Sequence, residues 1–259
     1  MASGYVTTAD LEMYYETYGS DDHALPPLLL IHGGGSTIAT NWSNILPLLS
    51  GDRQVIAIEE EGHGRTRATD RPLTSEASAA DIVEVLTALD VGPVDVLAFS
   101  AGAQTALALA MSAPARVRRL ILASAPWRRD AMIDGFWAGL EQGTLDDMPD
   151  LFKDEHRRLN GDDPASVQRL FDLDRGRMLA FTDWLDDDIA AVRMPTLIIA
   201  ADQDVVTVSG AVRLSTTLAH ARLLIVPGNH GDYLGEAMAS GDDLTTMHST
   251  AALILNFLS

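Results

Sequence analysis

Short runs of continuous apolar residues recur along this chain of 259 residues, and each run stops at glycine or polar residues. Such runs are typical of strands buried on both faces of a parallel sheet. Helix-like segments separate them, so the sequence predicts an α/β fold with a mostly parallel, doubly wound sheet. The expected strands are Leu11–Tyr18, Pro27–Ile31, Val55–Ile58, Val94–Phe99, Leu120–Ala123, Thr196–Ala200 and Leu223–Val226, and the expected helices are Ser75–Leu89, Gly102–Met111, Gly210–Ala219 and Leu244–Leu258.

The alternation of strand and helix is interrupted between Trp127 and about Arg193. This stretch contains helix-like segments, many acidic residues and several glycine or proline breakers, but no buried-strand run. It is far longer than an ordinary connection between two strands. We expect a helical cap over residues 127–193, inserted into a core formed by residues 1–126 and 194–259. The alternative is a set of ordinary surface helices.

Composition excludes several classes of function. Eighteen basic residues against thirty-seven acidic ones give a net charge of −19, which disfavours nucleic acid and anionic membranes as partners. Without cysteine there is no disulfide, thiolate metal site or cysteine nucleophile. No metal-binding or nucleotide-binding motif is present, so we expect neither a metal nor a cofactor. Lacking a signal peptide and a membrane-spanning run, the chain is expected to be cytoplasmic, a monomer or homodimer acting on a small molecule.

Candidate catalytic residues follow the expected strands, at the sheet edge where ligands of parallel sheets bind. Ser100 ends one run and precedes a helix, and its small neighbours Ala98 and Gly102 permit the sharp turn that an exposed nucleophile needs. His230, in "PGNHGD" after the last run, is the candidate base, since imidazole exchanges protons near neutrality. The spacing predicts that these two side chains meet at one edge.

An acid and an oxyanion site complete the constellation. "AADQDVV" offers Asp202 and Asp204, and we favour Asp204 as the carboxylate that orients His230 because Asp202 suits a turn cap. The loop "HGGG" at His32–Gly35 exposes backbone amides, so Gly34 is one expected oxyanion donor. The amide of Ala101, next to the nucleophile at a helix N-terminus, is the other.

Other prominent residues have structural or binding interpretations. His32 is expected to brace the glycine loop, and His63 to be structural rather than catalytic. Trp127 directly follows an expected core strand and is the candidate wall of the substrate pocket. The remaining histidines, His23 among them, have no partners at metal-ligand spacing. Most acids of the expected cap are interpreted as solvated, and they disfavour strongly anionic substrates.

These segments together resemble the α/β-hydrolase superfamily, in its capped serine-hydrolase, esterase-like form. "LLLIHGGGS" resembles the oxyanion strand and loop, "VIAIEEEGHGRT" the D-x-x-G-H-G-R-S segment, and "VLAFSAG" the nucleophile elbow. "PTLIIAADQDVV" resembles the acid loop and "LLIVPGNHG" the histidine loop. The resemblance implies Ser100 as nucleophile, Asp204 as acid and His230 as base. Ala98, Glu59 and Ala201 depart from the residues usual in the family.

The expected function is hydrolysis of a small, mostly apolar carboxylic ester or lactone by a serine hydrolase through an acyl-enzyme. Cleavage of a carbon–carbon bond, amide hydrolysis and cofactor-free perhydrolysis with the same triad remain open, because one fold hosts many chemistries. A non-catalytic ligand-binding protein is a further alternative, but it would be expected to have a broken triad.

Overall fold

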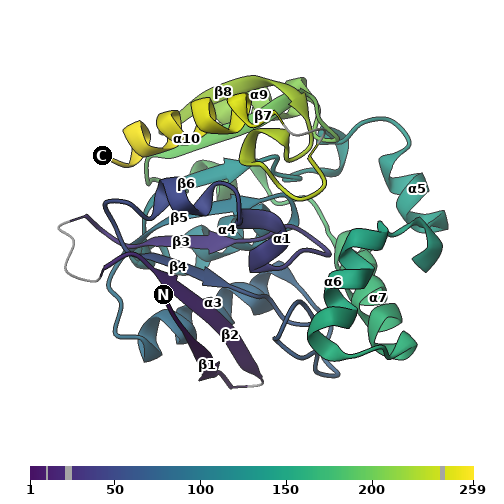
Figure 1. The fold of residues 1–259 in the computed structure, drawn as a ribbon. Coiled ribbons are helices and arrows are strands. Elements are labelled where there is room, and N and C mark those ends of the chain that lie inside the picture. The colour runs from purple at the N-terminus through teal and green to yellow at the C-terminus, as the bar shows by residue number, and fades with distance from the viewer. Residues whose placement is uncertain (10, 21–24, 240–242) are drawn as a thin grey trace.

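The computed structural model describes residues 1–9, 11–20, 25–239 and 243–259 (Figure 1), so His23 lies outside the described residues. In these residues eight strands form one sheet in the order β1-β2-β4-β3-β5-β6-β7-β8. β1 and β2 run antiparallel at one edge, and every neighbouring pair from β4 to β8 is parallel, which confirms the predicted sheet. The strands are β1 (Ala2–Thr7), β2 (Glu12–Tyr18), β3 (Leu28–Ile31), β4 (Val55–Ile58), β5 (Val94–Phe99), β6 (Val117–Ala123), β7 (Thr196–Gln203) and β8 (Ala221–Asn229).

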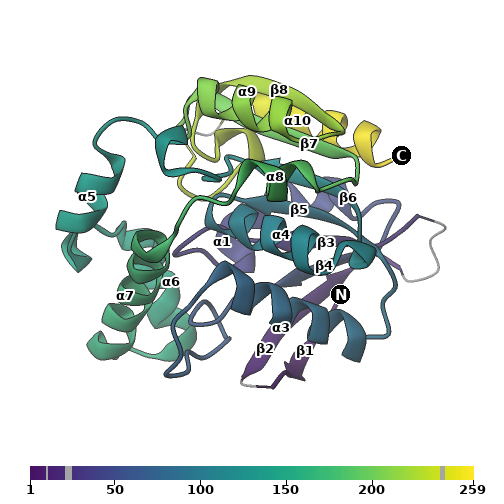
Figure 2. The same cartoon turned by 180° about the vertical axis from the view of Figure 1, so that it is seen from behind.

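Helices cover both faces of the sheet, as Figures 1 and 2 show from opposite sides. One core cluster joins the sheet to α3 (Ser75–Ala88), α4 (Ala101–Ser112), α8 (Asp186–Ala190) and α9 (Val208–Thr217). The other joins it to α1 (Ile38–Trp42), α2 (Leu46–Leu49) and α10 (Thr245–Leu258). Successive strand residues enter opposite clusters, because side chains of a strand alternate between its faces. In β5, for example, Val96 and Ala98 enter one cluster and Leu97 and Phe99 the other.

Some elements were absent from the sequence prediction. β1 is an edge strand whose side chains are mostly exposed, so it has no continuous apolar run. The helices α1 and α2 are too short to show helical periodicity. Within the described ranges, no helix has both the length and the apolar character needed to cross a bilayer.

The segment between β6 and β7 is helical, with α5 (Phe136–Gln142), α6 (Asp150–Asn160), α7 (Pro164–Ala180) and the short α8. Both views show α5, α6 and α7 projecting to one side of the sheet (Figures 1 and 2). The two ends of the segment do not project with these helices. Trp127 at one end, and Ile189 and Val192 at the other, are buried in the core cluster with α4 and α9. The division into a core and a cap at residues 127 and 193 stays a prediction.

A buried ion pair lies at the end of the sheet opposite Ser100. Asp95, near the start of β5, accepts hydrogen bonds from Arg53 Nη1 at 2.9 Å and Arg118 Nε at 2.8 Å. The side chains of Arg53 and Asp95 are 2% and 0% exposed, so each depends on the other for charge compensation. The side chain of Arg118 is 32% exposed.

We predict that Asp95→Ala lowers the free energy of unfolding by about 3–5 kcal/mol, because it leaves the Arg53 guanidinium buried without a carboxylate. Arg118→Gln is the matched control and should cost about 1 kcal/mol or less, since water can replace this partner. Urea denaturation measures both. Equal losses in the two variants would contradict the claim that the buried Arg53 guanidinium requires the Asp95 carboxylate for charge compensation.

Candidate active site

Ser100 lies on a strained turn between β5 and α4. Its backbone has φ 52° and ψ −122°, a conformation that non-glycine residues seldom adopt. A Cβ at Gly102 would come 2.2 Å from the His32 carbonyl oxygen, so only glycine lets this turn approach the glycine loop. Ala98 is fully buried in the core cluster, so the structure accommodates its methyl group in place of the usual glycine.

The side chains of Ser100, His230 and Asp204 meet at the carboxyl ends of β5, β8 and β7. His230 Nε2 lies 3.0 Å from Ser100 Oγ, and His230 Nδ1 lies 2.6 Å from Asp204 Oδ1. Both distances are within hydrogen-bonding range, so the three groups form one continuous chain. Asp202 is exposed and accepts a hydrogen bond from the Gly228 amide at 3.0 Å instead.

Asp204 is anchored by several donors besides His230. Burial alone would raise the pKa of its carboxyl group, but hydrogen bonds from His230, Ser124 and the Val206 amide hold that pKa below its ordinary value. The ionised carboxylate therefore favours the His230 tautomer that carries its proton on Nδ1, leaving Nε2 to accept from the serine.

Two further residues of this network escaped sequence reasoning. Ser124 donates a hydrogen bond to Asp204 Oδ2, and its own oxygen lies 2.6 Å from the Tyr233 hydroxyl. Ser124 directly follows β6 with φ 50°, so a polar residue at a strand end was the available signal. Tyr233 is fully buried three residues after His230 and carried no comparable signal.

The glycine loop is held so that the direction of the Gly34 amide is fixed. The Gly33 carbonyl accepts from His32 Nδ1 at 2.7 Å and from the Ser36 amide at 3.3 Å. In a trans peptide, the Gly34 N–H points opposite that carbonyl. Burial lowers the pKa of His32 to about 4, so the ring is neutral and its Nε2 accepts from the Glu60 amide at 3.0 Å. His32 thus braces the loop, as expected from the sequence.

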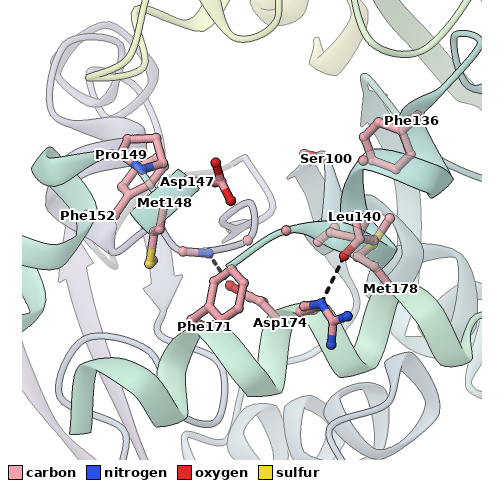
Figure 3. Close-up of a pocket in the computed structure, with 16 residues that line it drawn as sticks. Ser100, Phe136, Leu140, Asp147, Met148, Pro149, Phe152, Phe171, Asp174 and Met178 are labelled. Carbon is pink, nitrogen blue, oxygen red and sulfur yellow. Dashed lines mark hydrogen bonds between the residues drawn. The ribbon is translucent and has the colours of Figure 1, made fainter. Parts of the chain in front are cut away.

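A cavity of about 380 Å³ opens beside Ser100, Gly34 and Ala101 (Figure 3). Most of its wall is apolar and comes from α5, α6, α7 and the loop between α5 and α6. Three charged residues also line it: Asp147, Asp174 and Arg175. The Arg175 guanidinium donates to the Leu140 and Glu141 carbonyls at 2.9 and 2.6 Å. The apolar wall residues are Phe136, Leu140, Met148, Phe152, Phe171 and Met178.

The structure corrects the expectation that Trp127 lines this pocket. Its side chain is fully buried in the core cluster, and its Nε1 donates to the Gly210 carbonyl at 3.1 Å. The indole is held there because α9 offers both apolar contact and a hydrogen-bond acceptor. Across the described residues, no group of three or more histidine and acidic side chains is arranged to hold a metal ion.

Helix α7 brings two charged contacts that sequence reasoning missed, one part-buried and one buried. Asp174 lies 2.9 Å from His63 Nε2 and also accepts from the Gly35 amide. Arg177 pairs with Glu60 at 3.0 Å and donates to the Ala101 carbonyl at 2.7 Å. Acids and arginines are common on solvated helices, so nothing in the sequence separated these two from their exposed neighbours.

The environment of the His63–Asp174 contact favours the charged form of both side chains. Burial alone would lower the pKa of His63, but the Asp174 carboxylate raises it above the ordinary 6.5. Burial alone would raise the pKa of Asp174, but His63 lowers it below the ordinary 3.8. The stabilisation that this pair gives the folded protein is therefore complete between pH 3.8 and pH 6.5, the ordinary pKa values of the two groups. It is lost as pH rises through the folded-state pKa of His63.

We predict that the difference in unfolding free energy between the wild type and Asp174→Asn is largest near pH 5 and shrinks as pH rises above neutrality. The asparagine keeps the shape of the side chain but has no negative charge to stabilise a protonated His63 ring. Urea denaturation at a series of pH values measures this difference. A difference that grows with rising pH would have the wrong sign for the proposed pair.

Comparisons with known proteins agree with this architecture. The family model of the α/β hydrolase fold matches residues 26–153. A 2-hydroxy-6-oxo-2,4-heptadienoate hydrolase of Pseudomonas putida is 30% identical over 80% of this chain and 83% of its own length. A Caulobacter protein assigned as a carbamate hydrolase is 27% identical over 95% of this chain and 96% of its own length. A meta-cleavage product hydrolase structure from Pseudomonas fluorescens superposes with a TM-score of 0.78 at 22% identity, covering 98% of this chain and 96% of that one. This sheet, together with the Pseudomonas putida relative that matches over four-fifths of both chains, shows that the chain belongs to the α/β-hydrolase superfamily.

Proposed function

We propose that this protein is a serine hydrolase that cleaves a small, mostly apolar carboxylic ester or lactone. The observation that carries the proposal is the continuous chain from Ser100 Oγ through His230 to Asp204, with contacts of 3.0 and 2.6 Å. A nucleophile, a base and an orienting acid in that order are the requirements of acyl transfer through a covalent intermediate.

In the acylation step His230 Nε2 takes the Ser100 proton as Oγ attacks the substrate carbonyl. Asp204, ionised and anchored by Ser124 and the Val206 amide, stabilises the imidazolium that forms. The amides of Gly34 and Ala101 donate to the oxyanion of the tetrahedral intermediate. In the described residues, no protein group accepts a hydrogen bond from the Gly34 amide, so it is available to substrate.

Collapse of the intermediate expels the alcohol, which receives its proton from His230. Water then attacks the acyl-enzyme with His230 again as base, and the carboxylic acid leaves while Ser100 recovers its proton. In a lactone the alcohol and the acid stay joined in one product. Each step uses the same two donors and the same base.

The cavity favours neutral, apolar substrates. Its volume of about 380 Å³ and its aromatic and methionine side chains suit a small apolar acyl or alkyl group. Its charged lining consists of Asp147, Asp174 and Arg175, and the Arg175 guanidinium is engaged by two carbonyls. Asp174 is already paired with His63, so it is the apolar lining rather than the charges that favours neutral substrates.

A second candidate reaction is hydrolysis of a carbon–carbon bond. It is supported by the Pseudomonas putida relative, whose name specifies a dienoate substrate. A dienoate carries a carboxylate, which would lose hydration against the mostly apolar wall of the cavity. Amide hydrolysis and perhydrolysis use the same triad, so a panel of esters, lactones, amides and dienoates under one set of conditions separates these reactions.

We predict that a fluorophosphonate probe labels wild-type protein at Ser100 alone, because His230 activates only this hydroxyl. Ser100→Ala should abolish both labelling and ester turnover while leaving the circular dichroism spectrum unchanged. Peptide mapping by mass spectrometry locates the label. A label on another serine, or ester turnover that survives in the variant, would refute the assigned nucleophile.

Asp204→Asn is predicted to lower kcat by about ten-thousandfold, because an amide favours the wrong imidazole tautomer and does not stabilise the imidazolium. Asp202→Asn is the matched control, since its carboxylate contacts the Gly228 amide rather than His230. Steady-state kinetics with a p-nitrophenyl ester compares them. Similar losses in both variants would contradict the assignment of Asp204 as the carboxylate that orients His230.

A further inference from the structure

Helix α7 contacts both halves of the oxyanion site that the proposed function requires. The two contacts come from Asp174 and Arg177, which are three residues apart and therefore lie on one face of the helix. Figure 3 shows the Asp174 carboxylate directed at the glycine loop, with its hydrogen bond to that loop drawn as a dashed line. The two charges act on different segments of the core.

Asp174 holds the glycine loop from the side of the cavity. Its Oδ2 accepts the Gly35 amide, which belongs to the peptide immediately after Gly34. The same oxygen lies 2.9 Å from His63 Nε2, and His63 Nδ1 lies 3.0 Å from the Glu61 carbonyl. These contacts tie Asp174 to the core through the buried His63 ring, whose Nε2 also lies 3.2 Å from the Gly35 amide nitrogen.

Arg177 holds the nucleophile elbow. Its guanidinium donates to the Ala101 carbonyl at 2.7 Å and to Thr105 Oγ1 at 2.5 Å, and it pairs with Glu60 Oε2 at 3.0 Å. Arg177 and Glu60 have side chains 2% and 1% exposed, so water does not compete with the pair. The Ala101 residue whose amide faces the oxyanion is therefore fixed through its own carbonyl.

The two contacts are connected through the core. Thr105 donates to Glu60 Oε1 at 2.7 Å, and the Glu60 amide donates to His32 Nε2 at 3.0 Å. His32 Nδ1 in turn donates to the Gly33 carbonyl, whose peptide carries the Gly34 amide. The hydrogen bonds thus run without a break from Arg177 to the peptide that presents the first oxyanion donor.

We infer that Asp174 and Arg177 of α7 are positioning residues that hold the Gly34 and Ala101 amides in the geometry that binds the oxyanion. Neither side chain reacts with substrate. The inference rests on the proposed function, because it concerns the donors of that same reaction. It makes α7 part of the catalytic geometry as well as a wall of the cavity. An error of about 1 Å in such donors is enough to cost about a hundredfold in rate.

The test measures turnover and affinity for a tetrahedral adduct in the same variants. Asp174→Ala, Asp174→Asn, Arg177→Met and Arg177→Lys are compared by kcat and KM for a p-nitrophenyl ester and by Ki for a trifluoromethyl ketone, which forms an oxyanion on Ser100. Arg169→Gln is the matched control. Arg169 also lies on α7 and contacts the exposed Asp70, and among the described residues its charge makes no contact with the glycine loop or the Ser100 turn.

The alanine and methionine variants are expected to lose about 10- to 100-fold in kcat with KM nearly unchanged, and Ki should rise by the same factor. Asp174→Asn should recover part of the loss, since its amide oxygen still accepts from Gly35. Arg177→Lys should recover less, because an ammonium cannot engage three acceptors in the fixed geometry of a guanidinium. The Arg169→Gln control should match the wild type.

Three outcomes would overturn the inference: unchanged kcat in folded variants, a loss of kcat without a parallel rise in Ki, or a change confined to KM. Circular dichroism identifies the variants that fold, and the conservative asparagine and lysine replacements carry the test if the larger truncations do not. Absence of ester turnover and of Ser100 labelling in the wild type would overturn the proposed function as well, and this result is obtained before any variant is made.

Discussion

The close approach of the nucleophile turn to the glycine loop is the contact on which the site depends. A side chain at Gly102 would collide with the His32 carbonyl, so glycine there lets β3 and β5, neighbours in the sheet, present their ends side by side. Ser100 then adopts positive φ, a strain that the buried parallel strands around it can sustain. The loop amides, the serine and the start of α4 are thereby brought to one point.

The charges around this point are compensated in pairs. Asp204 faces His230, Asp174 faces His63 and Glu60 faces Arg177, so each of these three carboxylates has a basic partner. Breaking one such pair would leave a charge in a poorly solvated place, which costs more than a surface ion pair gains. Hydrogen bonds also constrain the partners to one geometry, and the proposed stabilisation of an oxyanion requires such fixed donors.

The inserted helices have two different relations to the core. Helices α5, α6 and α7 form the apolar wall of the cavity, whereas α8 and the flanking Trp127 pack into the core cluster. Part of the cavity wall and the contacts of Asp174 and Arg177 come from the same helix, α7. The inferred positioning role of α7 would therefore couple the shape of the substrate to the geometry of the proposed oxyanion donors.

The sequence by itself determined the class of fold, the buried strands of the sheet and the residues that end them. Continuous apolar runs and small residues at fixed offsets are local features, so Ser100, Asp204, His230 and Gly34 could be singled out from the chain alone. It could not locate β1, whose exposed side chains leave no apolar signal. Nor could it exclude Trp127 from the pocket, because a large apolar side chain suits a core and a cavity wall equally well.

Only the tertiary structure decided which polar residues share a site. Asp174 and Arg177 look like any charged pair on a helix until α7 is packed over the glycine loop and the elbow. Ser124, Tyr233 and Glu60 likewise acquire partners from segments distant in the chain. The physical reason is that local pattern reports whether a residue prefers water or the interior, whereas the partner of a buried polar group is set by three-dimensional packing.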